Sequence, residues 1–321
     1  MYKRQALGSC AYINETQYDR PGKPYGSNYQ IFESIHKKQP DAMLWLGDNT
    51  YLREVDWFTR SGIHHRYTHT RSLPEMQSLL ASTHHYAIWD DHDFGPNDAD
   101  RSFIHKDKTL EAFKLFWGNP TFGLPDQKGT TSFFKWSDID FFMLDNRYHR
   151  SPNHRITTKA QILGKEQLEW LVDALTFSRA PFKMIAVGGQ LLNSAESYEN
   201  HAALAPQEKA YLLDRIAEEG ITGVVFLNGD RHKTELSSMT NRNKHTIYDL
   251  TVSPLTSGAN TWPEDNRFRV EGTEVQKHNF AILEFSGPRK DRKMTIKVYD
   301  ANGVELWIKE IGKSDIIPEK K

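Results

Sequence analysis

Residues 43–51 read MLWLGDNTY, and this stretch decides the fold. Its first four residues, Met43–Leu46, form an apolar run of strand length, which is typical of a parallel strand buried on both faces. Gly47 ends the run and is followed by an acid, Asp48, and by a phenol, Tyr51. Because open α/β sheets carry their chemistry at the carboxyl ends of parallel strands, we expect both side chains to face a site.

Three further apolar runs end in the same way. They are Ala87–Trp89 before Asp90-Asp91-His92-Asp93, Met184–Val187 before Gly188-Gly189-Gln190, and Val224–Leu227 before Asn228-Gly229-Asp230-Arg231-His232. If these four strand ends converge on one edge, they form a site rich in carboxylate and imidazole groups.

Strands and helices are expected to alternate at first and to give way to consecutive strands from residue 245 onward. Apolar spacing and capping residues predict helices at residues 28–38, 72–80, 107–117, 164–175 and 206–219. Further strands are expected at residues 5–13, 131–135, 139–144, 246–252, 280–285, 293–299 and 305–308. This order predicts an α/β fold of two facing sheets with helices outside. Without a fixed repeat or a long linker, a single domain over residues 1–321 is expected.

Composition excludes several classes of protein. The formal net charge is -1, which gives no reason to expect a nucleic-acid or anionic-membrane surface. A single cysteine excludes an intramolecular disulfide. No apolar run approaches the ~20 residues needed to span a bilayer. Residues 1–5 (MYKRQ) have no apolar segment behind them, so no signal peptide is expected in this sequence.

The strand ends offer candidate metal ligands. Asp48 and Tyr51 are three residues apart on a turn and can reach one cation, although a solvated turn explains the pair equally well. The run Asp90–Asp93 strengthens the metal interpretation, because four adjacent ionisable groups repel one another unless cations or bases neutralise them. Its alternative is an exposed acidic turn. Asp230 and His232 can face one side of an extended segment, although a lone histidine is more often structural.

Other candidates remain open between two interpretations. Cys10 is either a small buried apolar residue or a ligand at the end of the first strand. Gln190 either hydrogen-bonds a substrate or ligates a hard cation through its amide oxygen. Arg147 either presents its planar fork to a phosphate or pairs with Asp145. The histidine-rich residues 64–69 (HHRYTH) are expected to form a polar loop without acids, mostly solvated.

Five motifs occur in an order that resembles the alkaline phosphatase D family. They are Gly8-Ser9-Cys10, Gly47-Asp48-x-x-Tyr51, Trp89-Asp90-Asp91-His92-Asp93, Asp145-x-Arg147-x-x-Arg150 and Gly229-Asp230-x-His232. The family belongs to the calcineurin-like metallophosphoesterases and is related to purple acid phosphatases. The resemblance implies a four-layer α/β/β/α sandwich, phosphoester hydrolysis, and a ferric ion accompanied by one or two calcium ions. The family often carries an N-terminal all-β domain, which we expect to be absent here.

The same resemblance implies roles for individual residues. Four of them look like iron ligands: Cys10, Asp48, Tyr51 and His232. Asp48 would bridge to a second cation, which Asp91 and Asp230 would also hold. His92 looks like the histidine beside the substrate, and Asn97, Gln190 and Arg231 are expected to contact the substrate or support the ligands. Because the family is largely exported, a periplasmic or cell-surface location is also implied.

The ligand types agree with these metals. Phenolate and thiolate suit a ferric ion, whereas carboxylates and an amide oxygen suit calcium. The set of candidate ligands contains few histidines, which argues against a pair of zinc ions. Zn²⁺ or Mn²⁺ could still substitute for iron or calcium. A metal-activated hydroxide would attack the phosphoryl group, with His92 protonating the leaving oxygen or holding an equatorial one and Arg147 offsetting charge.

The leading hypothesis is therefore a metal-dependent phosphomonoesterase or phosphodiesterase that acts on a small or polymeric phosphoester. One alternative is a non-catalytic, calcium-stabilised binding module, which has no use for Cys10 and Tyr51. Another is a metal-independent glycoside hydrolase that uses a carboxylate pair such as Asp91 and Asp230, which leaves His232 without a role. The oligomeric state does not follow from the sequence.

Overall fold

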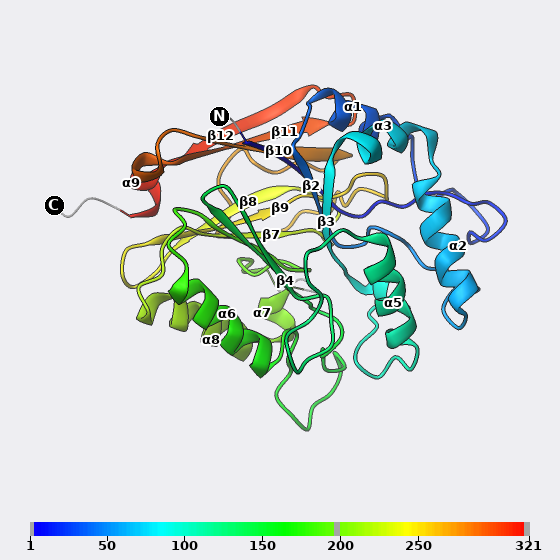
Figure 1. The fold of residues 1–321 in the computed structure, drawn as a ribbon, viewed down its shortest axis with the longest axis horizontal. Helices are drawn as coiled ribbons and strands as arrows, with labels where there is room; N and C mark the ends of the chain where they lie inside the picture. The colour runs from blue at the N-terminus through cyan, green and yellow to red at the C-terminus, as the bar shows by residue number, and fades with distance from the viewer. Residues whose placement is uncertain (1–2, 196–199, 318–321) are drawn as a thin grey trace.

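Two six-stranded sheets pack face to face in the computed structural model, which describes residues 3–195 and 200–317. The first sheet has the strand order β12-β11-β10-β1-β2-β3, and the second has β4-β5-β6-β7-β9-β8. In Figure 1 the first sheet lies above the second, and helices cover the outer sides. The predicted α/β architecture with two mixed sheets between helices is confirmed.

The first sheet combines three parallel strands with three antiparallel ones. Its strands are β1 (Lys3–Gly8), β2 (Ala42–Leu46), β3 (His84–Ile88), β10 (Asn279–Ser286), β11 (Lys293–Asp300) and β12 (Glu305–Ile311). Strands β1, β2 and β3 run parallel, whereas β10 pairs with β1 in the antiparallel sense and continues to β11 and β12. The sheet therefore has three parallel carboxyl ends along one edge.

The second sheet has a longer parallel centre. Its strands are β4 (Ser132–Trp136), β5 (Ile139–Met143), β6 (Lys183–Ala186), β7 (Val224–Asn228), β8 (Glu235–Thr240) and β9 (Thr246–Thr251). Strands β5, β6, β7 and β9 are parallel neighbours, and the flanking strands β4 and β8 pair antiparallel. Strand β8 had no counterpart among the predicted strands.

Strand β2 explains why its apolar run does not alternate with polar residues. Leu44 and Leu46 lie in the core between the two sheets, whereas Met43 and Trp45 lie in the core between the first sheet and its helices. All five residues of the strand are buried. Because each fully buried apolar side chain contributes about 1.5–3 kcal/mol, covering both faces of the strand fixes its position firmly.

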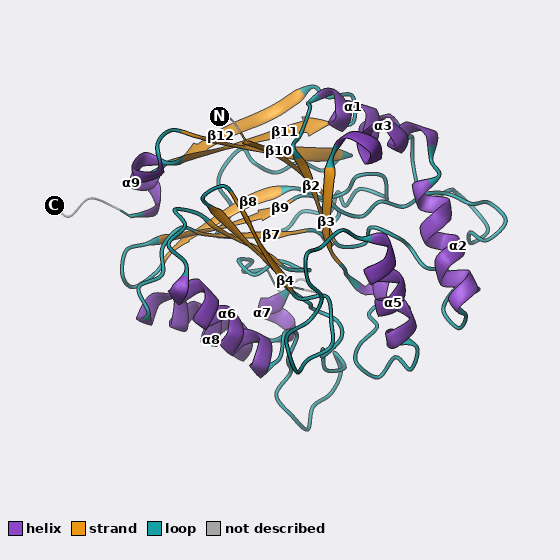
Figure 2. Cartoon of the chain, viewed as in Figure 1, coloured by secondary structure: helices purple, strands orange, loops and turns teal. Residues whose placement is uncertain are grey.

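Helices cover both outer faces, as the secondary-structure colouring of Figure 2 shows. The longer ones are α1 (Gln30–Lys37), α2 (Arg60–Arg71), α3 (Pro74–Ser82), α5 (Lys106–Phe116), α6 (Lys165–Phe177) and α8 (Pro206–Glu218). Three short ones are α4 (Asp91–Phe94), α7 (His201–Leu204) and α9 (Lys313–Ile316), and η1 (Arg289–Asp291) is a 3-10 turn. Helices α1, α2, α3 and α5 pack on the first sheet, and α6 and α8 on the second.

The histidine-rich residues 64–69 lie in helix α2, so the prediction of a solvated polar loop is wrong. The side chain of Thr59 caps the helix by accepting a hydrogen bond from the Gly62 N–H. The buried face includes Arg66, whose guanidinium pairs with Glu15 and with Asp56 at 2.9 Å. The acids that compensate this segment therefore come from other parts of the chain.

The first strand is shorter than the predicted residues 5–13. It ends at Gly8 because Cys10 has a φ of 57°, which takes the backbone out of the extended region. Helix α7 was also not predicted from the sequence. In the described part of the chain, no helix has the length and apolar character to cross a membrane.

Candidate metal centre

Carboxyl ends of parallel strands from both sheets meet at one edge of the molecule. Cys10 follows β1, Asp48 follows β2, Asp91 follows β3, and Asp230 and His232 follow β7. Backbone hydrogen bonds tie these ends together, with the Cys10 N–H donating to the Gly47 carbonyl at 3.2 Å. Three of the four predicted runs, those of β2, β3 and β7, therefore end at this edge with their acids, whereas β6 leads to Gln190, which contacts Glu235 and Asn193.

Gly229 makes the close approach of the two sheets feasible. A Cβ atom at this position would lie 2.3 Å from Ser9 Oγ and 2.8 Å from the Leu46 carbonyl oxygen. Any side chain would therefore push the end of β7 away from the ends of β1 and β2. The glycine before Asp230 is needed for contact between strand ends of different sheets.

Four of the candidate ligands adopt a left-handed backbone. The φ angles are 57° at Cys10, 51° at Asp48, 65° at Asp230 and 51° at His232. Each non-glycine residue in this region costs about 1–3 kcal/mol, and such strain persists where the surrounding structure enforces it, often at functional sites. Of the eight non-glycine residues with positive φ in the described part of the chain, four are thus candidate ligands of this one site.

The first group of donor atoms surrounds one oxygen of Asp48. Its Oδ2 lies 3.3 Å from the Tyr51 hydroxyl and 3.8 Å from Cys10 Sγ. The Tyr51 hydroxyl is in turn 3.4 Å from His232 Nε2. Ligands that bind a common ion at roughly 2.0–2.3 Å lie about 3–4 Å from one another, so this group has the spacing of a coordination sphere.

A second group shares Asp48 with the first. Ligand atoms of Asp48, Asp91 and His92 lie within 4.8 Å of one another, as do those of Cys10, Asp48 and His232. Asp230 belongs to neither group, although its carboxylate is near enough to raise the pKa of both Asp48 and Cys10. Asp48 is therefore the residue that the two groups share.

Electrostatics of the site fit bound cations. Burial, together with the negative charges of Asp91 and Asp90, raises the pKa of Asp48 well above its usual value. Burial, and to a smaller extent the charge of Asp48, likewise raises the pKa of the Cys10 thiol. Burial, and to a smaller extent the charge of Cys10, raises the pKa of the Tyr51 phenol. A bound cation reverses this balance, because it favours the anionic form of every donor around it.

Arg147 supports the carboxylates from behind the site. Its side chain is 1% exposed, forms a short ion pair with Asp90 and lies 3.7 Å from Asp91 Oδ1. Burial alone would raise the pKa of Asp91, but the charges of Arg147 and His92 lower it far below its usual range. One interpretation of Arg147 was an ion pair with Asp145. Asp145 accepts a hydrogen bond from the backbone N–H of Arg147 at 2.9 Å, whereas the guanidinium forms ion pairs with Asp90 and Asp91. The guanidinium instead positions Asp91.

His92 lies on Tyr51 at the centre of the site. The two rings pack with centroids 4.3 Å apart, and the backbone N–H of His92 donates to Asp48 Oδ1 at 3.2 Å. Burial lowers the pKa of His92, so a neutral imidazole is favoured in the free site. The residues 90–93 are buried or partly buried, which excludes the alternative of an exposed acidic turn.

Three residues expected near the substrate have other contacts. Gln190 is 1% exposed and donates to Glu235 at 2.7 Å, while its amide oxygen accepts from Asn193 at 2.7 Å. Asn97 is exposed and donates to the neighbouring Asp98 at 3.0 Å. Arg231 lies 3.2 Å from Glu264. The three residues are placed around the site rather than among the two donor groups.

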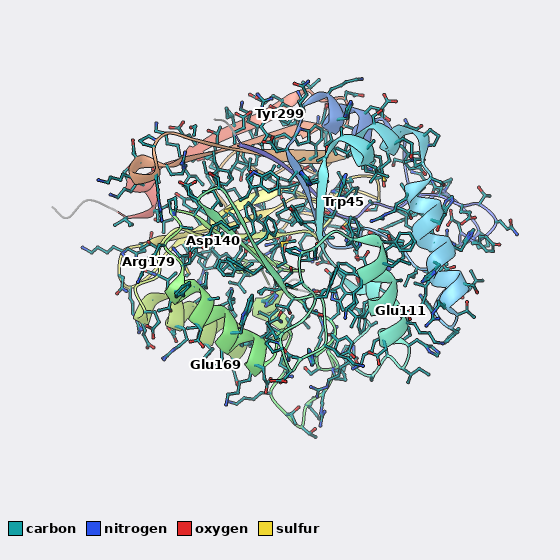
Figure 3. The ribbon with its side chains drawn as sticks, viewed as in Figure 1. Trp45, Glu111, Asp140, Glu169, Arg179 and Tyr299 are labelled. Atoms are coloured by element: carbon teal, nitrogen blue, oxygen red, sulfur yellow. The ribbon has the colours of Figure 1, made fainter. Side chains whose placement is uncertain are left out.

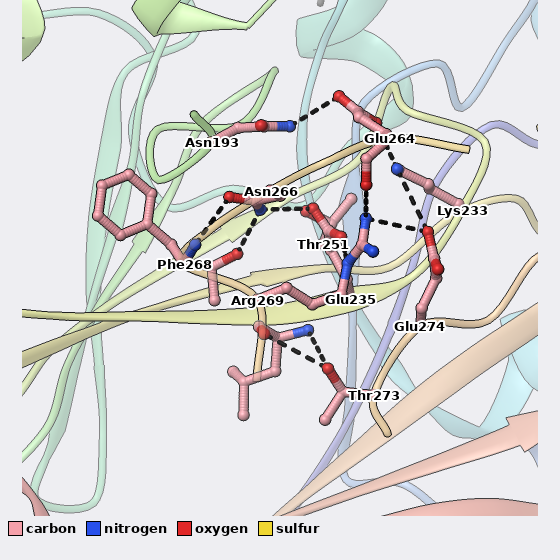
Figure 4. Close-up of polar contacts among 12 residues, drawn as sticks. Asn193, Lys233, Glu235, Thr251, Glu264, Asn266, Phe268, Arg269, Thr273 and Glu274 are labelled. Carbon is pink, nitrogen blue, oxygen red and sulfur yellow. Dashed lines mark hydrogen bonds and ion pairs between the residues drawn. The ribbon is translucent and has the colours of Figure 1, made fainter. Parts of the chain in front are cut away.

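Gln190 and Arg231 belong to a buried polar network, which Figure 4 shows in part. Glu264 binds the Lys233 ammonium, and Lys233 lies 3.5 Å from Glu274. Arg269 connects Glu274, at 3.0 Å, with Glu235. This network fixes the segment that presents Asp230 and His232, because Lys233 is fully buried and directly follows His232.

Hydroxyl groups complete the site and were not predicted. Ser253 Oγ lies 3.1 Å from Cys10 Sγ and accepts from the His232 N–H at 3.1 Å. Ser257 Oγ and the Tyr25 hydroxyl lie 3.3 Å from the two ring nitrogens of His232. The two serines follow β9, another parallel strand that ends at this edge. Both serines follow a predicted strand, so the sequence contains a signal for them when hydroxyl groups after a strand end are considered as well as acids.

Known structures share this architecture. A structure described as PhoD superposes with a TM-score of 0.74 at 16% identity, covering 97% of this chain and 71% of that one. Purple acid phosphatase PPD1 from yellow lupin (Lupinus luteus) seeds superposes with a TM-score of 0.69 at 11% identity, covering 97% and 53%. The chain therefore shares the fold of these two structures, in agreement with the predicted α/β fold of two mixed sheets with helices outside.

A family model places the chain more narrowly. The model of PhoD-like phosphatases matches residues 6–287, so the chain belongs to the PhoD-like phosphatase family. Alkaline phosphatase D of Bacillus subtilis (strain 168) is 21% identical over 330 residues, which cover 84% of this chain and 54% of that protein. The chain thus spans about half the length of this curated relative. The predicted family is confirmed.

Proposed function

We propose that the protein hydrolyses phosphate monoesters or diesters at a pair of cations on the convergent strand ends. One observation carries the proposal: Asp48 belongs to both donor groups, so two cations would share it. Two such cations would stabilise the negative charge of a phosphoryl group bound at this edge. The substrate is a small molecule or a polymer that presents its phosphate at this edge.

Donor chemistry assigns the two cations. Cys10, Tyr51 and His232 would hold a ferric ion together with Asp48, because phenolate and thiolate are strong anionic donors. Asp91 and Asp230 would hold calcium with the other side of Asp48, and Zn²⁺ or Mn²⁺ could take either place. When bound, the cations supply Lewis acidity to the phosphoryl group and acidify water.

The chain's own residues then handle protons and orientation. His92 lies beside Tyr51 and Asp48, and burial lowers its pKa. As a neutral imidazole it would hold an equatorial phosphoryl oxygen through its ring N–H, and once protonated it would give its proton to the leaving oxygen. Arg147 keeps Asp91 ionised and oriented through the ion pair with Asp90. Ser253 and Ser257 orient Cys10 and His232 by hydrogen bonds from outside the donor groups.

Neither alternative class explains the same contacts. A calcium-stabilised binding module does not need a buried thiol 3.8 Å from a shared carboxylate. A glycoside hydrolase needs two carboxyl groups that face a sugar ring. Of the candidate pair Asp91 and Asp230, Asp91 lies instead in a donor group with Asp48 and His92.

The test is hydrolysis of p-nitrophenyl phosphate and bis(p-nitrophenyl) phosphate before and after exhaustive chelation, with elemental analysis of each sample. We expect turnover and bound metal to disappear together and to return when iron and calcium are restored. Unchanged turnover in protein shown to be metal-free would refute the proposal. The family resemblance also supports a periplasmic or cell-surface location, which fractionation of cells producing the natural protein would test.

A further inference from the structure

A cavity lies at the amino ends of the parallel strands of the second sheet, away from the metal centre at their carboxyl ends. It has a volume of about 410 Å³ and is lined by the residues before β6 and β7, by the end of α6 and by α9. Strand β6 begins at this cavity with Lys183 and ends near Gln190, beside the network of the metal centre. In Figure 3 Arg179, from the cavity wall, lies near the left end of the molecule, far from Trp45 at the end of β2.

The lining of this cavity is strongly basic. Six of its side chains are cationic and one, Glu219, is acidic; the cationic ones are Arg179, Lys183, Arg289, Lys290, Arg292 and Lys313. The whole chain has a formal net charge of -1. Positive charge is therefore gathered at this cavity and is not a general property of the surface.

Most of these cations lack a carboxylate partner. Arg292 pairs with Asp138 at 2.7 Å. The other five form no ion pair with a carboxylate within the described ranges 3–195 and 200–317. Arg289 donates to the Arg179 carbonyl at 3.0 Å, a neutral acceptor.

Lys183 shows the same excess inside the protein. The residue is 5% exposed, and its ammonium donates to the carbonyls of Ala180 at 2.9 Å and Thr222 at 3.0 Å. An ammonium has three N–H donors, so one remains available. Burial and the charge of Arg179 lower the pKa of Lys183 to about 8 although the charge of Asp140 raises it, so a further anion in the cavity would favour the ammonium.

Helix ends do not account for the basic lining. Helices α6 and α8 both end at this cavity, and each C-terminus carries roughly half a negative charge. Of the five cations without a carboxylate partner, the two helix ends together offset about one and Glu219 offsets another. An excess of about three positive charges remains. Neutralising the helix ends would have needed fewer basic residues.

We propose that this cavity binds a tetrahedral oxyanion, either a free inorganic anion or the phosphate group of a small phosphorylated molecule. Arginine and lysine together suit such a ligand, because the guanidinium offers paired N–H donors and the ammonium a compact charge. The volume falls within the range of about 300–1,000 Å³ that is typical of small-ligand sites. The site is separate from the metal centre, so it does not depend on the proposed reaction.

Sulfate is the probe for the test, because it is a tetrahedral oxyanion that cannot be hydrolysed. The double variant Arg179→Gln, Lys313→Gln removes two exposed cations of the cavity, and Lys114→Gln, Lys159→Gln removes two exposed cations elsewhere. Titration calorimetry and thermal unfolding compare sulfate with chloride at equal ionic strength. Hydrolysis of an aryl phosphate without sulfate checks that the metal centre is intact in each variant.

Wild type and the control variant should bind sulfate alike, and the cavity variant roughly tenfold or more weakly, because hydrogen bonds to charged groups contribute about 1.5–3 kcal/mol each. Crystals soaked in selenate should show an anomalous peak among the basic side chains of the cavity. Equal sulfate affinity in all three proteins, or selenate confined to the metal centre, would overturn the proposal. Free anion and phosphorylated ligand are then separated by competing sulfate with phosphate and with a range of phosphomonoesters.

Discussion

Two buried clusters of charge adjoin along residues 230–233, and they are balanced in different ways. In the network around Glu264 and Glu235, each acid has a basic partner from the chain, Lys233, Arg231 or Arg269. At the metal centre, thiol, phenol and carboxylates face one another, and the guanidinium of Arg147 pairs with Asp90 and lies 3.7 Å from Asp91.

The pKa values follow this difference. Burial alone would raise the pKa of Glu264, but hydrogen bonding to Lys233 and the charge of Arg231 bring it down to about 2. The pKa of Asp48 is raised instead, because burial is reinforced by the charges of Asp91 and Asp90. One cluster is complete within the chain, and the other is complete only with added cations. Breaking each cluster in turn should therefore give different losses.

The largest effect is expected from Asp48→Asn. The substitution removes the one anionic oxygen pair that both donor groups share, so both cations should be lost and hydrolysis should fall to background. The fold should persist, because the neighbouring Asn49 backbone is held by Asp93 at 3.1 Å and not by Asp48. Elemental analysis and aryl phosphate turnover check this, and a variant that retained both metals would contradict the bridging role.

The next effect is expected from His92→Ala. Removing a positioned acid–base group should lower kcat by roughly 100-fold or more. The backbone N–H that donates to Asp48 remains, so metal content should stay near wild type. His92 also belongs to the second donor group, which makes metal content the deciding measurement. Loss of a cation together with activity would make His92 a ligand instead of a proton donor.

Lys233→Met should lower stability, because Lys233 belongs to the network and not to either donor group. Lys233 is fully buried, and its removal takes one of two basic partners from Glu264 and leaves Arg231. The loss should exceed that of an exposed pair and stay below the ~3–5 kcal/mol that breaking a buried pair typically costs. Lys277→Met is the matched control, because the Lys277 ammonium is 55% exposed and its pair with Asp300 should contribute no more than about 1 kcal/mol. Urea unfolding of both variants measures the difference, and equal losses would show that the network is not a stabilising unit.

How far the sequence could lead is clear from these two clusters. The strand ends that carry the candidate ligands were predictable, because an apolar run that is buried on both faces stops at a glycine and an acid, as β2 does at Gly47 and Asp48. The partner of Arg147 was not predictable, because Asp90 lies 57 positions away and only the folded chain brings them together. Helix α2 escaped prediction because its buried face includes Arg66 and Thr70, which disguise the apolar period.

Acid should weaken the network through Glu264. A carboxylate whose folded pKa is lowered contributes stability that is full above its unfolded pKa, about 4.5, and is lost as the pH falls toward the folded value of about 2. The stability difference between wild type and Glu264→Gln should therefore be constant from pH 7 to about pH 5 and shrink below pH 4.5. Urea unfolding at stepped pH measures it, and a difference that grew with acidity would reverse the assigned sign.

The smallest effect on stability, and the sharpest test of metal identity, is expected from Tyr51→Phe. A phenolate bound to ferric iron transfers charge to the metal in the visible range, so iron-replete wild type should be violet. The variant loses only the oxygen that lies 3.3 Å from Asp48 and 3.4 Å from His232, and the ring can still pack on His92 with centroids 4.3 Å apart.

We therefore expect the visible band to vanish while the unfolding temperature stays nearly unchanged. Cys10→Ser is the companion variant, because it replaces a soft anionic donor by a neutral hydroxyl and should shift the band and weaken iron binding without abolishing the colour. Two results together would exclude ferric iron at the donor group that contains Tyr51: a colourless wild type purified from cells supplied with iron, and a fully active Tyr51→Phe variant. It would leave a calcium- or zinc-dependent phosphoesterase on the same strand ends, since the shared Asp48 does not depend on the phenol.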